Sequence, residues 1–426
     1  MVNARPAPYP STPFALAAAA AIAVAVSGAV PGAAGAPADG VVFENVDRAI
    51  PRAAVTGLLA LKLANLAKID PDHPLAADSA RQTLSLFGRE DLIAAQSEDY
   101  RPTGCAALAQ ADDVLDAIAR HARATTIVII NESHERSEDR GFTATVAARL
   151  RPLGYTALAL EALQNDPPTT PERYRPPFVR QPTLPYLTDE DGFYLSEAAF
   201  GRLGRRAKAL GYRLVPYEAN PDDGLPATAT DAQRIAVREA RQARNLAAFV
   251  TAHPGTRLLV HVGYHHALEQ PRADGARWMA ARLKAMTGVD PLTISQTDCR
   301  GGGVSDRLAV LPADQPPGSF DLVVDHPTAR FERGRPVWRA LAGDRPVSVP
   351  AALRPSSGWR VIEARPVGEP VISVPVDRVA IRPGEDVALM FPPGRYRLRA
   401  IDVAWHDPKP VPLAQQTPAG ADRSIR

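Results

Sequence analysis

The chain has 426 residues, enough for roughly two or three domains and for a large buried core. With 45% hydrophobic and 23% charged residues it has the composition of a globular protein, which excludes wholesale disorder, collagen and coiled coil. Lysine and arginine number 49 against 47 acidic residues, so the formal net charge of +2 gives no basic surplus for a phosphate backbone. We therefore expect no nucleic-acid partner.

The first 38 residues predict an export signal. Residues 14–30 read FALAAAAAIAVAVSGAV, an uncharged apolar run, and the Ala-Pro-Ala tripeptide that ends at residue 38 fits a signal-cleavage site. We expect the segment 1–38 to be removed and the mature protein to be periplasmic or secreted. A retained anchor is the alternative, and the uncleaved signal segment would then be the protein's contact with the membrane.

The sequence contains two cysteines, Cys105 and Cys299. They are too few and too far apart in the chain for a zinc cluster. In an oxidising compartment such a pair most simply forms one disulfide, and two buried thiols are the alternative.

The chain divides into regions of different periodicity. Residues 39–124 carry apolar side chains at three- and four-residue spacing, which predicts an N-terminal helical region. In residues 125–306 short β-branched runs alternate with amphipathic stretches, the pattern of βαβ units with mostly parallel strands. The strands of this α/β domain are expected at 125–131, 155–161, 212–218, 257–263 and 291–296, and helices at 142–154 and 231–255.

The C-terminal part has the pattern of short strands. Residues 320–408 alternate apolar and polar positions between Pro and Gly, which predicts a small β-rich module, and residues 409–426 predict a flexible tail. We assign this module to packing or partner docking, so a chain ending near Asp306 is expected to keep the functional site. The predicted fold class is α/β: a central, mostly parallel sheet flanked by helices, with an N-terminal helical region and a β-rich C-terminal module.

Ionisable side chains directly follow the predicted strands. If the strands are parallel, these side chains share the carboxyl edge of the sheet, where open α/β sheets bind ligands. Helix caps and solvated turn residues are the alternative interpretation. The side chains are Glu132, His134, Glu161, Glu218, Tyr264, His265 and His266.

Two chemistries suit these residue types, and the pattern leaves both open. His134, Glu161 and His266 are ordinary ligands for zinc or manganese, with a position left for an activated water. Alternatively, a histidine removes a proton from water or from a substrate hydroxyl while a glutamate orients its ring. The HExxH and GxSxG motifs do not occur, so the common metalloprotease and serine hydrolase templates do not apply.

The succession of motifs resembles one superfamily, which contains the ChaN-like haem-binding proteins, the erythromycin esterases and the TIKI-type metalloproteases. TTIVIINESHERSEDRGF and LRPLGYTALALEAL are similar to its Gly-Glu-x-His-type opening and its second strand ending in Glu. VREARQARNLAAFV and TRLLVHVGYHHAL are similar to its Arg-Asp/Glu helix and its second Gly-x-x-His motif. The matching positions are Glu132, His134, Glu161, Arg238, Asn245, Gly263 and His266.

This resemblance implies a hydrolase or a cofactor-binding protein. We expect an exported hydrolase of ester or peptide bonds that acts on a small-molecule or peptide ligand, and we make no prediction of its oligomeric state. The alternative is a periplasmic protein that binds haem or a metal without turnover. The expected catalytic residues are Glu132, His134, Glu161 and His266, and the expected binding residues are Glu218, Arg238, Asn245, Tyr264 and His265. A divalent metal (zinc or manganese) or haem is the cofactor that the resemblance allows.

Overall fold

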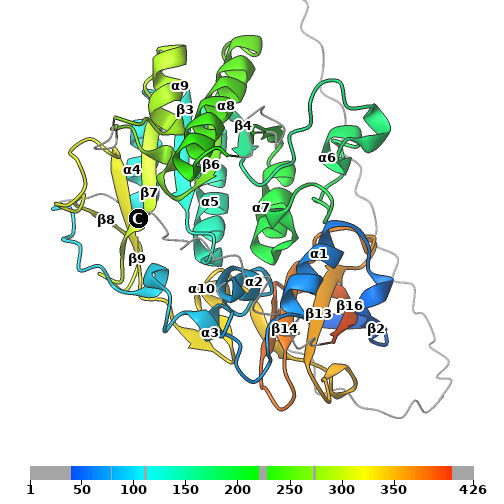
Figure 1. Cartoon of the computed structure of the whole chain (residues 1–426). Helices are drawn as coiled ribbons and strands as arrows, with labels where there is room; N and C mark the ends of the chain where they lie inside the picture. Colours follow the sequence, from blue (N-terminus) through cyan, green and yellow to red (C-terminus); the bar gives the residue numbers. More distant parts are fainter. Residues whose placement is uncertain (1–39, 78, 110–112, 220–227, 272–274, 405–426) are drawn as a thin grey trace, which may run out of the picture. The chain divides into compact units, whose positions relative to one another are not determined.

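A mostly parallel sheet forms the centre of the α/β domain (Figure 1). The computed structural model describes residues 40–77, 79–109, 113–219, 228–271 and 275–404. Within these ranges the sheet has seven strands in the order β5-β4-β6-β3-β7-β9-β8, all parallel except β8. They are β3 (Ile127–Glu132), β4 (Tyr155–Leu160), β5 (Arg213–Pro216), β6 (Arg257–Gly263), β7 (Leu292–Arg300), β8 (Arg307–Ala309) and β9 (Leu322–His326).

The five predicted strands are all present, so the predicted fold class is confirmed. Helices cover both faces of the sheet, and the buried residues of β3 alternate between the two cores as the two-residue period of a strand requires. Ile127 and Ile129 pack with α8 and α9, whereas Val128 and Ile130 pack with α4, α5 and α7. The bounds of these helices are α4 (Val114–Ala122), α5 (Ser137–Leu150), α7 (Ala198–Ala209), α8 (Asp231–Ala252) and α9 (Met279–Thr287).

Helix α8 begins at a capping box. The Thr230 hydroxyl accepts from the backbone N–H of Gln233, and the Gln233 side chain accepts from the backbone N–H of Thr230. Two otherwise unpaired N–H groups are thereby satisfied. Ala243 and Leu246 pack against the sheet, and the same helix places Arg238, Glu239 and Gln242 at the end of the sheet where the ionisable residues gather.

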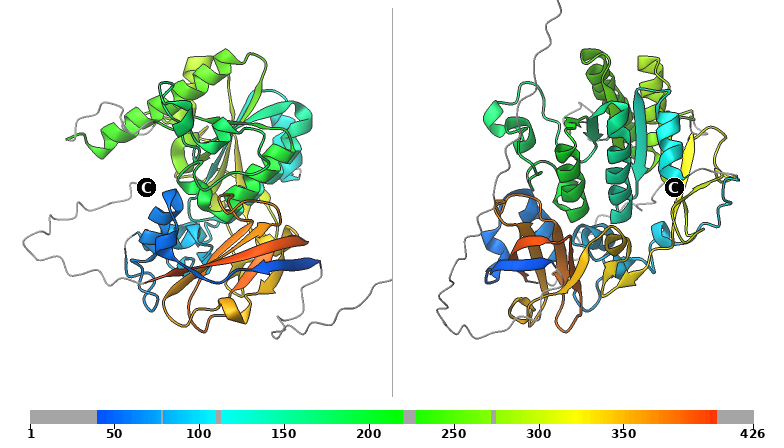
Figure 2. Two further views of the ribbon diagram at one scale, coloured as in Figure 1. Left: turned by 90° about the vertical axis from the view of Figure 1, so that its right-hand side faces the viewer. Right: turned by 180° about the vertical axis from the view of Figure 1, so that it is seen from behind.

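The C-terminal strands form a second sheet, and the N-terminal strand belongs to it (Figure 2). Strand β1 is parallel to β16, its neighbour in the sheet, and β16 is antiparallel to β13. Leu63 of α1 and Leu84 of α2 share a core with Trp359 and Ile401 of this sheet. The elements are β1 (Val41–Val46), β2 (Ile50–Pro51), α1 (Gly57–Leu66), α2 (Ala80–Leu86), β13 (Trp359–Pro366), β14 (Asp377–Ile381) and β16 (Gly394–Val403).

Shorter elements complete the described chain. Two small two-stranded sheets pair β10 with β11 and β12 with β15. Their bounds are β10 (Phe331–Glu332), β11 (Arg335–Pro336), β12 (Arg345–Ser348) and β15 (Ala388–Phe391), and the short helices are α3 (Glu90–Ile93), α6 (Pro177–Arg180) and α10 (Trp338–Leu341).

The central sheet continues past residue 306, where the α/β domain was predicted to end. Strand β9 is buried along its whole length and pairs with β7, and β8 pairs with β9. Leu322 and Val324 lie in the same core as Val128 of β3. The structure therefore argues against the expectation that a chain ending near Asp306 keeps its site, although the other domain boundaries stay predictions.

The predicted disulfide is confirmed. Cys105 and Cys299 are bonded, with their Cα atoms 5.8 Å apart, and they join the segment before α4 to strand β7. The predicted signal segment, 1–38, and the predicted tail, 409–426, lie outside the described residues. In the part of the chain that the structure describes, no helix is long and apolar enough to span a bilayer.

Candidate functional site

The carboxyl ends of four strands bring the candidate residues together. Glu132 is the last residue of β3, and Glu161 directly follows β4. Glu218 lies just after β5, and β6 leads from Gly263 into the 3-10 helix Tyr264–Ala267. Since β5, β4, β6 and β3 are consecutive neighbours in the sheet, these residues lie along one edge of it.

His134 and Glu132 form a histidine–carboxylate pair. The Nδ1 atom of His134 lies 3.0 Å from Oε1 of Glu132. A carboxylate at Nδ1 favours the tautomer that carries its proton there, and Nε2 then keeps a free lone pair. His134 is partly exposed, with 20% of its side chain open to solvent, whereas Glu132 is buried.

Arg140 and His261 also contact the carboxylate of Glu132. Arg140 of α5 contacts both carboxylate oxygens, with Nη2 donating to Oε1 at 3.1 Å and Nε lying 2.8 Å from Oε2. The buried ring of His261 lies 3.3 Å from the same Oε2. Burial acts to raise the pKa of Glu132, but Arg140, His261 and His134 outweigh it and lower the pKa. Glu132 is therefore ionised and able to orient His134.

Two aromatic rings and the backbone of Gly263 hold the ring of His134 in place. It stacks on Tyr194 at a centroid distance of 5.0 Å and meets Tyr264 edge-on at 5.1 Å. Its Nε2 edge lies against Gly263, where a Cβ atom would be 2.8 Å from Nε2 and 3.2 Å from Oε2 of Glu161. A side chain at position 263 would clash with the ring, so this glycine is required for the close approach.

Glu161 is a second buried carboxylate at this edge, and it lies beside His266 and Arg238. Its Oε2 accepts the backbone N–H of Gly263 at 2.6 Å, and its Oε1 accepts from Arg238 and, at 3.4 Å, from Gln242. Burial acts to raise its pKa, but His266, Arg238 and His134 lower the pKa well below the ordinary range. Glu161 thus carries its negative charge throughout the physiological pH range.

His266 lies between two carboxylates. Its Nδ1 contacts the buried Glu239, whose other oxygen accepts the N–H of Met279 at 2.6 Å, and its Nε2 lies 3.5 Å from Glu161. Burial acts to lower the pKa of His266, but Glu161 and Glu239 raise the pKa above its ordinary value. Nε2 of His266 also lies 3.1 Å from Nη1 of Arg238, from which the neutral ring can accept a hydrogen bond.

Arg238 links Glu161 to Glu218. Its Nε donates to Oε1 of Glu218 at 3.0 Å, and 39% of its side chain is exposed. Asn245, one to two turns further along α8, donates to the backbone carbonyls of Tyr217 and Glu218 at 2.9 and 3.2 Å. Asn245 therefore fixes the backbone that carries Glu218, while Arg238 presents a positive charge to solvent.

Tyr264 anchors the turn that carries His134. Its hydroxyl donates to Asp99 at 2.9 Å and accepts the backbone N–H of His134 at 3.3 Å, and its carbonyl accepts from Asn131 at 2.9 Å. Its φ of 38° is in the left-handed region that residues with side chains seldom adopt. Burial and the Asp99 carboxylate raise the pKa of Tyr264, so its hydroxyl stays protonated.

Most of the predicted site residues meet in the structure. They form two bonded groups, His134 with Glu132 and Tyr264, and Glu161 with His266, Arg238 and Glu218. Gly263 lies between the groups, since its N–H donates to Glu161 and its backbone lies against the ring of His134. His265 instead turns its ring toward Trp278, at a centroid distance of 5.5 Å. Residues that the sequence patterns did not single out for the site are Asp99, Arg140, Tyr194, Glu239 and His261, of which Glu239 was signalled only by its place next to Arg238.

The predicted metal set of His134, Glu161 and His266 stays a prediction. In the described residues no group of three or more His, Cys, Asp or Glu side chains is arranged to hold a metal ion. The guanidinium of Arg238 contacts both Glu161 and His266, so a positive charge already lies beside two of the three proposed ligands. A metal ion here would be repelled by Arg238.

Comparisons with known proteins give a distant likeness of fold. No protein-family model matches the chain, and no curated protein sequence matches it significantly. A MARTX toxin effector domain from Vibrio vulnificus is 18% identical over 51% of this chain and 43% of that chain, with a TM-score of 0.33. The type III effector HopBA1 is 15% identical over 53% and 98%, with a TM-score of 0.34. ChaN of Campylobacter jejuni, solved with cofacial haem, is 8% identical over 50% and 91%, with a TM-score of 0.33.

The chain thus spans less than half the length of the Vibrio toxin structure. With TM-scores of 0.33 and 0.34, these structures have only a low likeness to the chain.

Proposed function

We propose that the chain is a hydrolase of ester or peptide bonds in which His134 is the general base and Glu132 orients it. The observation that carries the proposal is the 3.0 Å contact between Nδ1 of His134 and Glu132, together with the contacts of Glu132 to Arg140 and His261. A carboxylate held on both oxygens keeps the histidine in one tautomer, as a general base requires.

The proposed reaction begins with proton transfer to His134. Nε2 takes a proton from a water molecule as the water oxygen bonds to the carbonyl carbon of the substrate. Negative charge then develops on the carbonyl oxygen, and the cations available at this edge to stabilise it are Arg238 and protonated His266. The bond to the leaving alcohol or amine breaks as the leaving group takes a proton from imidazolium, which restores the neutral base.

The partial exposure of the site supports turnover of an external ligand. His134 and Arg238 are open to solvent by 20% and 39% of their side chains, whereas Glu132 and Glu239, which orient the two histidines, are buried. We further propose a small-molecule or peptide substrate and a periplasmic or secreted location. The disulfide supports the location because such bonds persist in oxidising compartments.

The test is a hydrolysis screen with matched histidine variants. Full-length protein is assayed on chromogenic esters and fluorogenic peptides, as wild type, His134→Asn and, as control, His121→Asn on the exposed end of α4. We expect turnover by the wild type and the control, and a roughly 10²- to 10⁴-fold lower rate for His134→Asn. The same assays with added zinc, manganese and haem, beside absorbance measurements in the haem band, address the binding alternative. Haem or metal uptake with no turnover of any substrate would refute the proposed hydrolase.

A further inference from the structure

The N-terminal region holds the turn that carries His134. The carbonyl of Glu135 accepts from the Tyr100 hydroxyl at 2.6 Å and from the Ser85 hydroxyl at 3.0 Å. The turn continues directly into α5, whose first residue is Ser137. The Tyr100 hydroxyl therefore holds the backbone of Glu135, the residue that follows the proposed general base.

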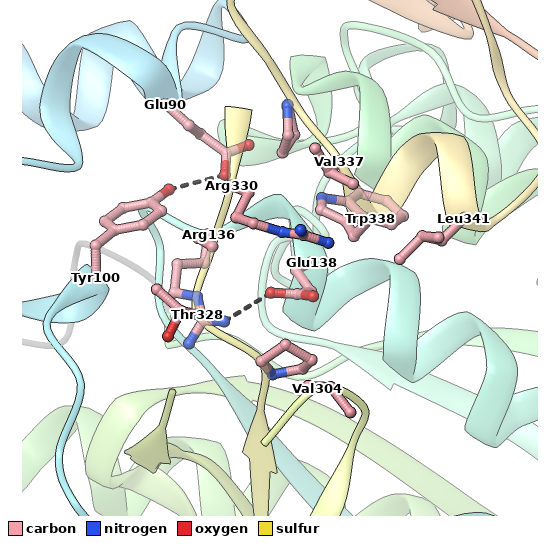
Figure 3. Close-up of a pocket in the computed structure, with 13 residues that line it drawn as sticks. Glu90, Tyr100, Arg136, Glu138, Val304, Thr328, Arg330, Val337, Trp338 and Leu341 are labelled. Carbon is pink, nitrogen blue, oxygen red and sulfur yellow. Dashed lines mark hydrogen bonds and ion pairs between the residues drawn. The ribbon is translucent and has the colours of Figure 1, made fainter. Parts of the chain in front are cut away.

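Glu90 is the buried group behind Tyr100. Its Oε2 lies 2.8 Å from the Tyr100 hydroxyl, and its Oε1 contacts the Ser137 hydroxyl. The indole N–H of Trp338 donates to the same Ser137 oxygen at 3.2 Å. Glu90 thus joins Tyr100, which holds the turn, to Ser137, which begins α5 (Figure 3 shows the Tyr100 contact).

The contacts of the Tyr100 hydroxyl fit a protonated Glu90 better than an ionised one. The Tyr100 hydroxyl has one hydrogen and two oxygen neighbours within hydrogen-bond distance, the Glu135 carbonyl and Oε2 of Glu90. The carbonyl has no hydrogen to donate, so an ionised Glu90 leaves one of these contacts without a proton. If Glu90 is protonated, it donates to Tyr100 and Tyr100 donates to the carbonyl, and every contact is satisfied.

The charges around Glu90 do not offset its burial. Among the described residues the charged side chains that act on Glu90 or line its cavity are Arg140, Glu197, Arg335, Arg136, Glu138 and Arg330. Three of these cations are paired elsewhere: Arg140 with Glu132 at 2.8 Å, Arg335 with Asp377 at 2.6 Å and Arg136 with Glu138 at 2.7 Å, whereas Arg330 is exposed to solvent. Burial therefore raises the pKa of Glu90 to about 7.

A cavity lies against Glu90 (Figure 3). It has a volume of about 50 Å³ and is lined by Glu90 and Tyr100 together with Arg136, Glu138 and Trp338. The cavity is large enough to hold water, because one water molecule needs roughly 10–15 Å³. Water in the cavity can therefore exchange a proton with the buried carboxyl.

We propose that Glu90 is a positioning residue that works as a neutral carboxylic acid, and that loss of its proton at alkaline pH loosens the turn carrying His134. The proposal rests on the proposed function, because it describes the regulation of that same site. An acid with a raised pKa stabilises the folded chain fully below its unfolded pKa, and this contribution is lost as pH rises through the folded value of about 7.

The test uses two readouts that need no substrate. Infrared difference spectra of the full chain follow the carbonyl band of a protonated carboxylic acid, and hydrogen exchange follows the protection factors of residues 133–136. We expect a band that titrates near neutral pH and is absent in Glu90→Gln, and turn protection that falls several-fold at alkaline pH in the wild type. Glu90→Gln, which can still donate to Tyr100, should keep its protection at both pH values. Glu98→Gln is the control, because Glu98 pairs with Arg101 at the surface.

Tyr100→Phe separates the two parts of the proposal. Without the hydroxyl the turn should lose protection at every pH while the infrared band of Glu90 persists. The proposal is overturned if Glu90 shows no protonated band at neutral pH, or if turn protection in the wild type is independent of pH. Since neither readout depends on turnover, a protein without hydrolase activity would refute the proposed function and leave this result standing. If turnover is found, its alkaline loss should be smaller in Glu90→Gln.

Discussion

His134 and His266 each contact a buried carboxylate through Nδ1, but their Nε2 atoms face different neighbours. Nε2 of His134 lies against the bare backbone of Gly263. Nε2 of His266 faces Glu161, which favours the imidazolium form. In the proposed reaction this difference gives proton uptake to His134 and positive charge to His266.

Removing the carboxylate behind His266 tests this assignment. Glu239→Gln should bring the pKa of His266 down, because one of the two carboxylates that raise it is neutralised. A histidine with a raised pKa stabilises the fold below its unfolded pKa and loses this contribution as pH rises through the folded value. We expect the alkaline limb of the pH–rate profile to move to lower pH, and the melting temperature of the variant to fall more at acid than at alkaline pH. An unchanged profile would show that His266 does not act as a cation.

Gly263→Ala tests the close approach of His134 to the sheet. The φ of Gly263 is −77°, so alanine brings no backbone strain, but its Cβ would lie 2.5 Å from Cε1 of His134. The ring has to move, and we expect a fall in kcat of roughly 10²-fold, typical of a misplaced catalytic group, in a chain that still melts cooperatively. Wild-type kcat in a folded variant would mean that the ring position is not important for the chemistry.

The residues on strand ends were predictable from sequence, and their partners were not. Glu132 ends β3, and Glu161 and His266 follow β4 and β6. Short β-branched runs identify these strands, so their parallel pairing brings the three residues to one edge of the sheet. Asp99 and Tyr194 come from segments that no periodicity connects to the sheet edge, and they reach the site only through tertiary packing. His261 lies inside β6, where nothing in the strand pattern indicates that its ring contacts Glu132.

At the scale of elements, the strands beyond residue 306 decide whether a truncated chain can fold. A chain ending at residue 306 lacks β8 and β9 and exposes the edge of β7, whereas one ending at residue 404 keeps the described fold. We expect the longer chain to match the full-length protein in circular dichroism and melting, and the shorter one to aggregate or melt without cooperativity. A soluble, active chain ending at residue 306 would contradict this account.

Strand β1 shows why the local sequence pattern does not predict the strand in the N-terminal region. VVFENV alternates only partly, and the residues that follow it have helical spacing, so the segment was assigned to a helical region. Its partner, β16, lies more than three hundred residues further along the chain. A pairing at that separation leaves no signal in either segment alone.

At the scale of the whole molecule, the disulfide closes a long loop. Cys105 and Cys299 are 194 residues apart in the chain. The chain-entropy model gives about 5 kcal/mol of stabilisation for a loop of this length. Thiol titration of denatured, unreduced protein should find no free cysteine, and Cys105→Ser with Cys299→Ser should lower the urea midpoint. Free thiols in exported protein, or an unchanged midpoint, would show that the bond is not formed or not stabilising.

The central claim is that His134 and Glu132 act as one catalytic unit, and a double-mutant cycle tests it most directly. kcat/KM is measured for wild type, His134→Asn, Glu132→Gln and the double variant, on the best substrate of the hydrolysis screen and with folding checked by circular dichroism. Each single change should lower kcat/KM by roughly 10²- to 10⁴-fold. The double variant should lose little more than the worse single variant, because either change alone already removes the function of the pair. Losses that multiply, or a single variant with wild-type activity, would contradict the account.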